Sequence, residues 1–250
     1  MNLSVDLMRE CVFEQLALDL NCSPADFDKE GMIFCVAKDN EGRRPFPRGE
    51  IHFEMLTAGK SVIVCASEKN IPYVKTQLQG KTCDEAFGMP FVHGTGMYYL
   101  PDLKNIKPFL PPENYEYKLY EKDEIPVLYE LDGFSNALAS GQTRILRPDV
   151  IAITASRAGK IIGMAGASAD SAKMWQIGID VFPEHRGNGL AAYLVNKLTL
   201  EIIERGFIPY YGTSVSNIAS QSVAHRAGYI ISWICSWKGR FDGEITEATC

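Results

Sequence analysis

The fold of this chain's second half is decided by the stretch IDVFPEHRGNGLA, residues 179–191. Its first residues end an apolar run that predicts a strand, and Pro183 stops that strand. Gly187 and Gly189 then open a turn into an amphipathic helix predicted over Gly189–Arg205, which a further glycine closes. The stretch therefore predicts a strand, a short loop and a long helix in direct succession.

A junction of this kind is suited to binding an anion. The first N–H groups of a helix have no partner within the helix, and the macrodipole places about half a positive charge there. Gly187 and Gly189 carry no side chain that would keep a phosphate away from those amides, and Arg186 adds a positive charge. A plain turn before a surface helix is the alternative explanation of two closely spaced glycines.

The surrounding elements predict a mixed sheet. Upstream, three apolar runs with short turns between them predict an antiparallel meander: Val150–Ala155, Lys160–Ala167 and Met174–Val181. Two short helical patterns come before the meander, at Ile125–Leu131 and Asn136–Ala139. Downstream, we expect a strand, a helix and a strand at Ile208–Gly212, Ala219–Ala227 and Tyr229–Trp237. The fold class predicted is therefore α/β (α+β), a mixed sheet flanked by helices.

The first half of the chain predicts a smaller α+β domain. Its expected elements are a helix over residues 3–20, a strand at Met32–Ala37, a hairpin of Ile51–Leu56 and Ser61–Ala66, and a helix at Ile71–Leu78. Residues 88–112 are rich in proline and glycine and are predicted to be a loop. We therefore predict two domains, residues 1–112 and 113–250.

The segment V-x-P followed by R-G-x-G-L-A, after three meander strands, resembles the signature of the GNAT superfamily of N-acetyltransferases, R/Q-x-x-G-x-G/A. Arg186, Gly189 and Ala191 stand at its fixed positions. Residues 217–220 and 227–229 are similar to the family's downstream segment, N-x-x-A/S followed by x-G-F/Y. The similarity covers roughly residues 120–238, and the whole chain most resembles a bacterial group with an extra N-terminal domain.

The resemblance implies that acetyl-CoA (coenzyme A) is the co-substrate and that no metal takes part. Its pantetheine arm would pair with the backbone of the strand end, and its diphosphate would lie on the amides at the start of the long helix. The residues so assigned are Ile179, Val181, Arg186, Gly187, Asn188, Gly189, Leu190, Ala191, Asn217 and Ser220. Asn217 also fits the N-cap of the next helix, and the two roles are compatible.

The chain departs from the family pattern at one catalytic position. The tyrosine that often protonates the departing thiolate is replaced by Ala224. A free thiol has a pKa of about 8.5, so water could serve instead. We take Asp180, Ser220 and Tyr211 as candidate catalytic residues, although Asp180 could equally be a structural carboxylate.

Two functions remain open on these grounds. The first is an N-acetyltransferase that moves an acetyl group from acetyl-CoA to a primary amine of a small molecule, by direct attack in a ternary complex. The second is a catalytically silent acyl-CoA-binding sensor or interaction module, which Ala224 would permit. The first domain could itself be a degenerate GNAT-like half, an idea that rests on the strand–strand–helix pattern at residues 51–79.

Composition excludes several classes of protein. Residues 1–115 carry 12 Lys and Arg against 16 Asp and Glu, and residues 116–250 carry 13 against 15, so neither half has the basic character of a nucleic-acid binder. No apolar run reaches the roughly 18 residues of a membrane span. The seven cysteines are scattered without a C-x-x-C pair, which argues against a zinc site or a disulfide framework. We expect a cytoplasmic protein, and the oligomeric state stays open.

Overall fold

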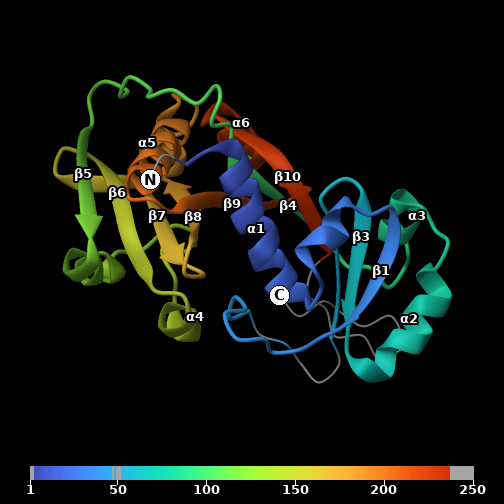
Figure 1. The fold of residues 1–250 in the computed structure, drawn as a ribbon. Coiled ribbons are helices and arrows are strands. Elements are labelled where there is room, and N and C mark those ends of the chain that lie inside the picture. The colour runs from blue at the N-terminus through green and yellow to red at the C-terminus, as the bar shows by residue number, and fades with distance from the viewer. Residues whose placement is uncertain (1–2, 47, 49–51, 237–250) are drawn as a thin grey trace. The chain divides into compact units, whose positions relative to one another are not determined.

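The computed structural model describes residues 3–46, 48 and 52–236, which divide into two compact units (Figure 1). One unit is built mainly from Tyr99–Gly212 and Asn217–Ile230, and the other mainly from Arg9–Tyr98. The domain boundary after residue 112 stays a prediction. Ile51 and Trp237, the outer ends of two predicted strands, lie outside the described residues.

The unit around Tyr99–Gly212 contains a sheet in the order β9-β8-β7-β6-β5. β8 is parallel to β9, whereas β7, β6 and β5 follow in antiparallel pairs, which confirms the predicted meander and the mixed sheet. The bounds are β5 Glu116–Glu121, β6 Asp149–Arg157, β7 Lys160–Ala169, β8 Met174–Val181 and β9 Ile208–Ser214.

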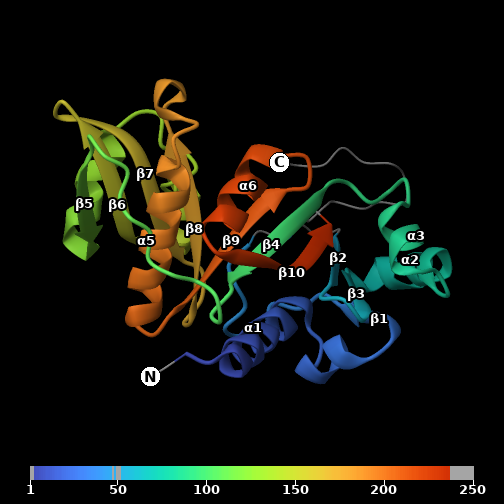
Figure 2. The ribbon, with the colours of Figure 1, turned by 90° about the horizontal axis from the view of Figure 1, so that it is seen from above.

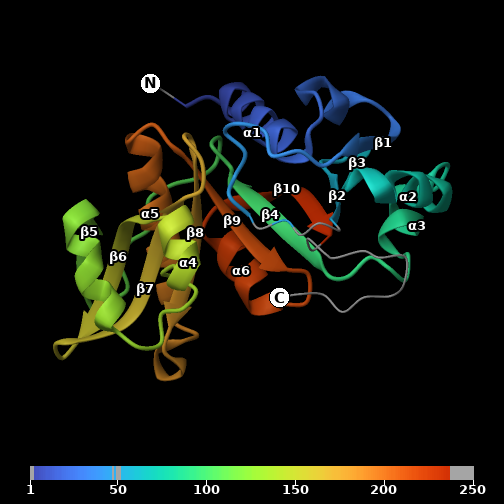
Figure 3. The same ribbon diagram turned by 90° about the horizontal axis from the view of Figure 1, so that it is seen from below.

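Helices cover both faces of this sheet. Figures 2 and 3 view the unit from opposite sides: α5 lies over the face seen from above, and α4 lies on the face seen from below. The segment after β8 forms the helix α5 because Leu190, Leu194 and Leu198 recur at helical spacing, and all three are buried. The bounds are η3 Lys122–Glu130, α4 Gly141–Leu146, η4 Pro183–His185, α5 Leu190–Glu204 and α6 Ile218–Arg226.

The second unit contains strands that are hydrogen-bonded in the order β1-β3-β2-β10. The predicted hairpin is confirmed, since β2 and β3 are antiparallel, and β1 runs parallel to β3. One face of this sheet packs on α2 and α3. The bounds are α1 Val5–Leu20, η1 Pro24–Asp28, β1 Gly31–Val36, β2 Phe53–Thr57, β3 Ser61–Ala66, η2 Glu68–Asn70, α2 Ile71–Leu78, α3 Cys83–Phe87, β4 Thr95–Pro101 and β10 Tyr229–Ser236.

Several elements differ from the sequence-based expectation. The predicted loop over residues 88–112 contains β4, and β5, α3 and α4, each only five or six residues long, were not predicted. The helical pattern at 125–131 forms the 3₁₀ segment η3, which has Pro126 inside it. No helix forms at 136–139. Among the described residues, no helix combines the length and the apolar character that crossing a bilayer requires.

The segment at 136–137 is instead pressed directly onto the sheet. Gly166 in β7 and Gly178 in β8 are register partners, so they lie side by side. A Cβ added at Gly166 would overlap the carbonyl oxygen of Ala137, and one added at Gly178 would overlap that of Asn136. The two glycines therefore form a flat platform on which the backbone of residues 136–137 rests.

We predict that Gly166→Ala lowers the free energy of unfolding by roughly 3 kcal/mol, because the new methyl group would push against backbone that has no rotamer to change. The matched control is Gly163→Ala in the same strand, where the nearest atoms are side-chain carbons of Leu194 and Val181 at 3.3 Å. That control should cost about 1 kcal/mol or less, since side chains can shift by tenths of an ångström. Urea unfolding followed by circular dichroism measures both, and equal losses would contradict the platform.

Candidate functional site

The sheet opens at the end of β8. The register of β8 with β9 runs from Met174–Ile208 to Ile177–Tyr211, and within the described residues the last four residues of β8 form no ladder with β9. Those residues, Gly178–Val181, remain paired with β7 on their other side. The backbone groups that face β9 are therefore in position to pair with an extended ligand, as an added strand would.

The loop after β8 turns back into α5 through two left-handed glycines. Gly187 has a φ of 83° and Gly189 a φ of 85°, values that other residues adopt only with strain. Gly189 is the N-cap of α5, so the N-cap residue itself supplies no side chain to cap the helix. The first turn of α5 also contains no acidic residue. Nothing lies within 4 Å of where a Cβ would stand at either glycine, so the loop borders open space.

Asn188, between the two glycines, holds the loop in this shape. Its Oδ1 accepts the Leu190 N–H at 3.2 Å, and its Nδ2 donates to the Tyr115 hydroxyl at 2.7 Å. The same hydroxyl lies 3.5 Å from Nδ1 of His185. Tyr115 therefore links both ends of the loop, a role that no pattern in the sequence indicated.

The sequence suggested that the Arg186 side chain points toward a bound anion, but in the structure it makes a hydrogen bond within the protein. Its Nε donates to the carbonyl oxygen of Val181 at 2.8 Å, so the side chain folds back over the end of β8. The contact joins the loop to the strand and brings the guanidinium close to Val181, where the loop begins. Arg186 itself is exposed, so its charge remains accessible to an anion at the loop.

Asp180 is engaged in three hydrogen bonds. Its Oδ2 accepts the backbone N–H groups of Asn136 at 2.8 Å and Ala137 at 2.9 Å, and its Oδ1 accepts Nδ2 of Asn136 at 2.7 Å. Because Gly178 and Asp180 are two residues apart, they point to the same face of β8. The glycine admits the segment 136–137 and the carboxylate fixes it, which favours the structural interpretation of Asp180.

The other two catalytic candidates form a pair. The hydroxyls of Tyr211 and Ser220 lie 2.8 Å apart, which joins β9 to α6 just where β9 parts from β8. Tyr211 is 2% exposed. Burial raises the pKa of Tyr211, the Ser220 hydrogen bond lowers it, and the Asp180 carboxylate adds to the rise. The phenol therefore keeps its proton throughout the neutral range.

Asn217 and Ala224 complete this region of the site. The Asn217 side chain accepts the Ser220 N–H at 3.1 Å, so Asn217 caps α6 as its residue type predicts. Ala224 is fully buried one helical turn after Ser220, so the two share one face of α6. Tyr211 thus reaches α6 one turn from the position where the family pattern has its tyrosine. In the described part of the chain, no group of three or more His, Cys, Asp or Glu side chains could hold a metal ion.

The structure brings the predicted residues together in two groups. Ile179 and Val181 alternate with Asp180, so they lie on the face of β8 that α5 covers, and Val181 lies beside Gly163 under Leu194 of α5. The loop residues and Asn188 border these strand ends. The second group is the pair of Tyr211 and Ser220. Sequence reasoning missed Tyr115 and Asn136, whose roles depend on contacts far apart in the chain.

Comparison with solved structures finds proteins to which part of this chain is distantly similar. A GNAT-family protein from Novosphingobium aromaticivorans is 20% identical over 57% of this chain and 63% of its own, with a TM-score of 0.44. A GCN5-related N-acetyltransferase-like protein from Streptococcus suis is 17% identical over 72% of each chain, with a TM-score of 0.43. This chain spans less than two thirds of the length of the first of these proteins. No curated protein matches the sequence.

A family model gives the more direct comparison. The model of the acetyltransferase (GNAT) family matches residues 110–229. The matched range contains the open end of β8, the glycine loop, α5 and the Tyr211–Ser220 pair. The predicted resemblance to the GNAT family is therefore confirmed for part of the chain, and residues 110–229 form a domain of the acetyltransferase (GNAT) family.

Proposed function

We propose that this domain transfers an acetyl group from acetyl-CoA to a primary amine of a small molecule, by direct attack of the amine in a ternary complex. The observation that carries the proposal is the junction of β8, the glycine loop and α5. There, strand backbone without a β9 partner leads directly into helix amides that border open space. A diphosphate and an extended amide-bearing arm have the chemistry to fill these two sites in succession.

The residues of the junction fit coenzyme A in charge and shape. Backbone N–H groups of Gly187, Asn188, Gly189 and Ala191 would hold the diphosphate, since those of Arg186 and Leu190 already donate to the Pro183 carbonyl oxygen and to Asn188 Oδ1. The guanidinium of Arg186 lies nearby, and the φ of both glycines is already set for the turn. The backbone of Ile179–Val181 would hold the pantetheine arm. Acetyl-CoA supplies an activated thioester, and these residues place it where β8 and β9 part.

In this proposal the acceptor amine lies near the opposite face of β8, beside the backbone of residues 136–137 that rests on Gly178. Asp180 fixes the backbone of residues 136–137 on that face, so it acts as a positioning residue in this proposal. The N–H groups at the end of β8 could stabilise the oxyanion that forms when the amine attacks. A small amine in the cytoplasm fits an acidic chain with a net charge of −6, whereas nucleic acid does not.

The Tyr211–Ser220 pair takes the place of the missing tyrosine in this proposal. The departing thiolate needs a proton, and the Tyr211 phenol holds one because burial raises its pKa. Ser220, hydrogen-bonded to the phenol oxygen and half-buried on α6, could return a proton to it from solvent. The silent acyl-CoA-binding module remains the alternative. It would bind coenzyme A but release no thiol with any amine.

Gly189→Ala should weaken coenzyme A binding by tenfold or more, because alanine resists the left-handed φ that aims the first α5 amides at the ligand. Gly159→Ala in the turn between β6 and β7 is the matched control. It has the same left-handed conformation and the same open space, and it should leave the affinity unchanged. Isothermal titration calorimetry measures both. Equal dissociation constants for wild type and Gly189→Ala would count against the loop as the binding site.

Tyr211→Phe should lower kcat by roughly 100-fold and leave the KM for acetyl-CoA nearly unchanged, because only proton donation is lost. Tyr129→Phe is the control, since it removes a phenol that hydrogen-bonds Asp149 instead. The rate is followed as thiol release with a panel of small amines. Because burial raises the pKa of Tyr211, its proton should be lost only above pH 10, so kcat of the wild type should show no decline from this group below that pH.

Two results would overturn parts of this account. If Tyr211→Phe keeps the wild-type kcat, the phenol is not the proton donor. If the wild type binds coenzyme A but no amine supports thiol release, the domain is the silent binding module.

A further inference from the structure

Tyr115 is held in place by parts of the fold that lie outside the glycine loop. It stands directly before β5, whose first residue, Glu116, pairs with Ser156 of β6. Its ring meets the ring of Tyr117 edge to face, with centroids 6.5 Å apart. Tyr117 in turn packs on the ring of Tyr193 in α5, with centroids 4.7 Å apart. The position of Tyr115 is therefore set by β5, β6 and α5.

The segment that leads to Tyr115 is anchored to α5 as well. Residues 107–115 form no helix or strand, so their backbone groups need other partners. Asn196, which is buried in α5, accepts the Phe109 N–H with its Oδ1 at 3.2 Å. Its Nδ2 donates to the carbonyl oxygen of Lys107 at 3.1 Å. These bonds hold the segment along α5 on its way to Tyr115.

The Tyr115 hydroxyl contacts the loop through one short hydrogen bond. Nδ2 of Asn188 donates to it at 2.7 Å, whereas Nδ1 of His185 lies 3.5 Å away, at the outer limit of a hydrogen bond. The other end of the same amide, Oδ1, accepts the Leu190 N–H at 3.2 Å. Tyr115 therefore fixes which way the Asn188 amide faces and, through it, the turn between the two left-handed glycines.

We propose that Tyr115 is a positioning residue for coenzyme A: through Asn188 it holds the glycine loop in the shape that presents the loop's amides to the diphosphate. This inference rests on the proposed function, because it concerns the same binding site. In the described part of the chain, the Asn188 side chain makes no further hydrogen bond. Without the Tyr115 hydroxyl, the exposed loop is ordered only when the ligand binds, which costs affinity.

A positioning role and a direct contact with the ligand predict different losses. If Tyr115 acts through Asn188, its hydroxyl matters only while the Asn188 side chain is present. If the hydroxyl binds the diphosphate itself, its loss weakens binding with or without that side chain. A double-mutant cycle on the two residues separates these cases.

The test measures the dissociation constant of coenzyme A for the full-length protein by isothermal titration calorimetry. Tyr115→Phe keeps the ring and should raise the constant roughly fivefold, the effect of losing one such hydrogen bond. Asn188→Ala removes both bonds of the amide and should raise it roughly tenfold. The double variant should equal Asn188→Ala alone, because the second change removes nothing further. Independent contributions would instead multiply to roughly 50-fold.

Kinetics give a second readout. At saturating acetyl-CoA, kcat of Tyr115→Phe should equal that of the wild type, whereas the KM for acetyl-CoA should rise in step with the dissociation constant. A residue that only supports the fold would not give this division, since its loss would lower the fraction of active protein and hence kcat.

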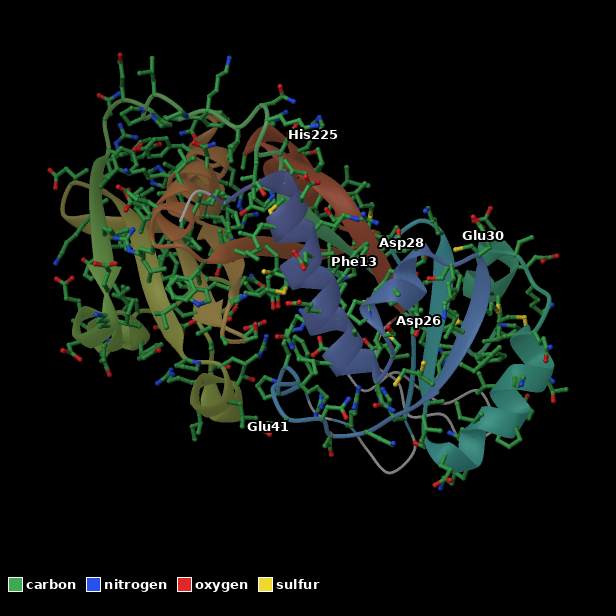
Figure 4. All side chains as sticks on the ribbon, viewed as in Figure 1. Phe13, Asp26, Asp28, Glu30, Glu41 and His225 are labelled. Carbon is green, nitrogen blue, oxygen red and sulfur yellow. The ribbon has the colours of Figure 1, made fainter. Side chains whose placement is uncertain are left out.

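Two controls match these variants. Tyr120→Phe removes a hydroxyl from β5 that makes no hydrogen bond among the described residues, so it should leave the affinity unchanged. His225, in the last turn of α6, is the other histidine of this unit (Figure 4). His225→Ala gives the baseline for His185→Ala, and both should stay within about twofold of the wild type, because the 3.5 Å contact of His185 is weak.

Three results would overturn the inference. They are an unchanged dissociation constant in Tyr115→Phe, a double variant roughly fivefold weaker than Asn188→Ala, and a loss in His185→Ala as large as that in Tyr115→Phe. A wild type that has no measurable affinity for coenzyme A is a distinct outcome. It would refute the proposed function, and the role of Tyr115 with it.

Discussion

The parting of β8 from β9 is the constraint on which the site depends. The two strands pair only as far as Ile177 and Tyr211, while β8 continues for four residues along β7. Backbone N–H and C=O groups are costly to leave without partners in a protein interior, so such an opening persists only where water or a ligand satisfies them. The glycine loop, the start of α5 and the Tyr211 hydroxyl all gather at this opening.

Glycine acts in two distinct ways around it. Gly166 and Gly178 lack side chains so that backbone can rest on the sheet, and Asp180 then fixes that backbone by its N–H groups. Gly187 and Gly189 border open space, and what they supply is a left-handed turn that aims amides outward. The first pair makes one face of β8 rigid, and the second makes its end receptive to an anion. In the proposed function, both pairs would be needed to hold a thioester at one fixed place beside an acceptor.

Much of this architecture could be predicted from local sequence. The bounds of β8 and α2 agree with the apolar runs at Met174–Val181 and Ile71–Leu78, because periodicity and turn residues act over a few positions. The loop at 179–191 was predicted for the same reason. Residues 136–139 have a helical pattern, but they form only a turn, whose backbone rests on the glycine platform, and tertiary packing of this kind leaves no local signal.

The contacts that define chemistry were harder to predict. The hydrogen bonds of Tyr115 to Asn188 and of Asp180 to Asn136 join positions that only the folded chain brings together. Tyr211 and Ser220 were named as possible substitutes for the tyrosine that Ala224 replaces, yet their hydrogen bond required the register of β9 and the cap of α6 by Asn217. Sequence thus identified the residue types and the structure identified the pairs.

The most direct measurement is the change in backbone amide chemical shifts on titration with coenzyme A. The account predicts large, saturable shifts for Ile179–Val181 and for residues 186–191, at the open end of β8 and the start of α5. Shifts confined to other residues, or none at ligand concentrations that saturate binding, would contradict it.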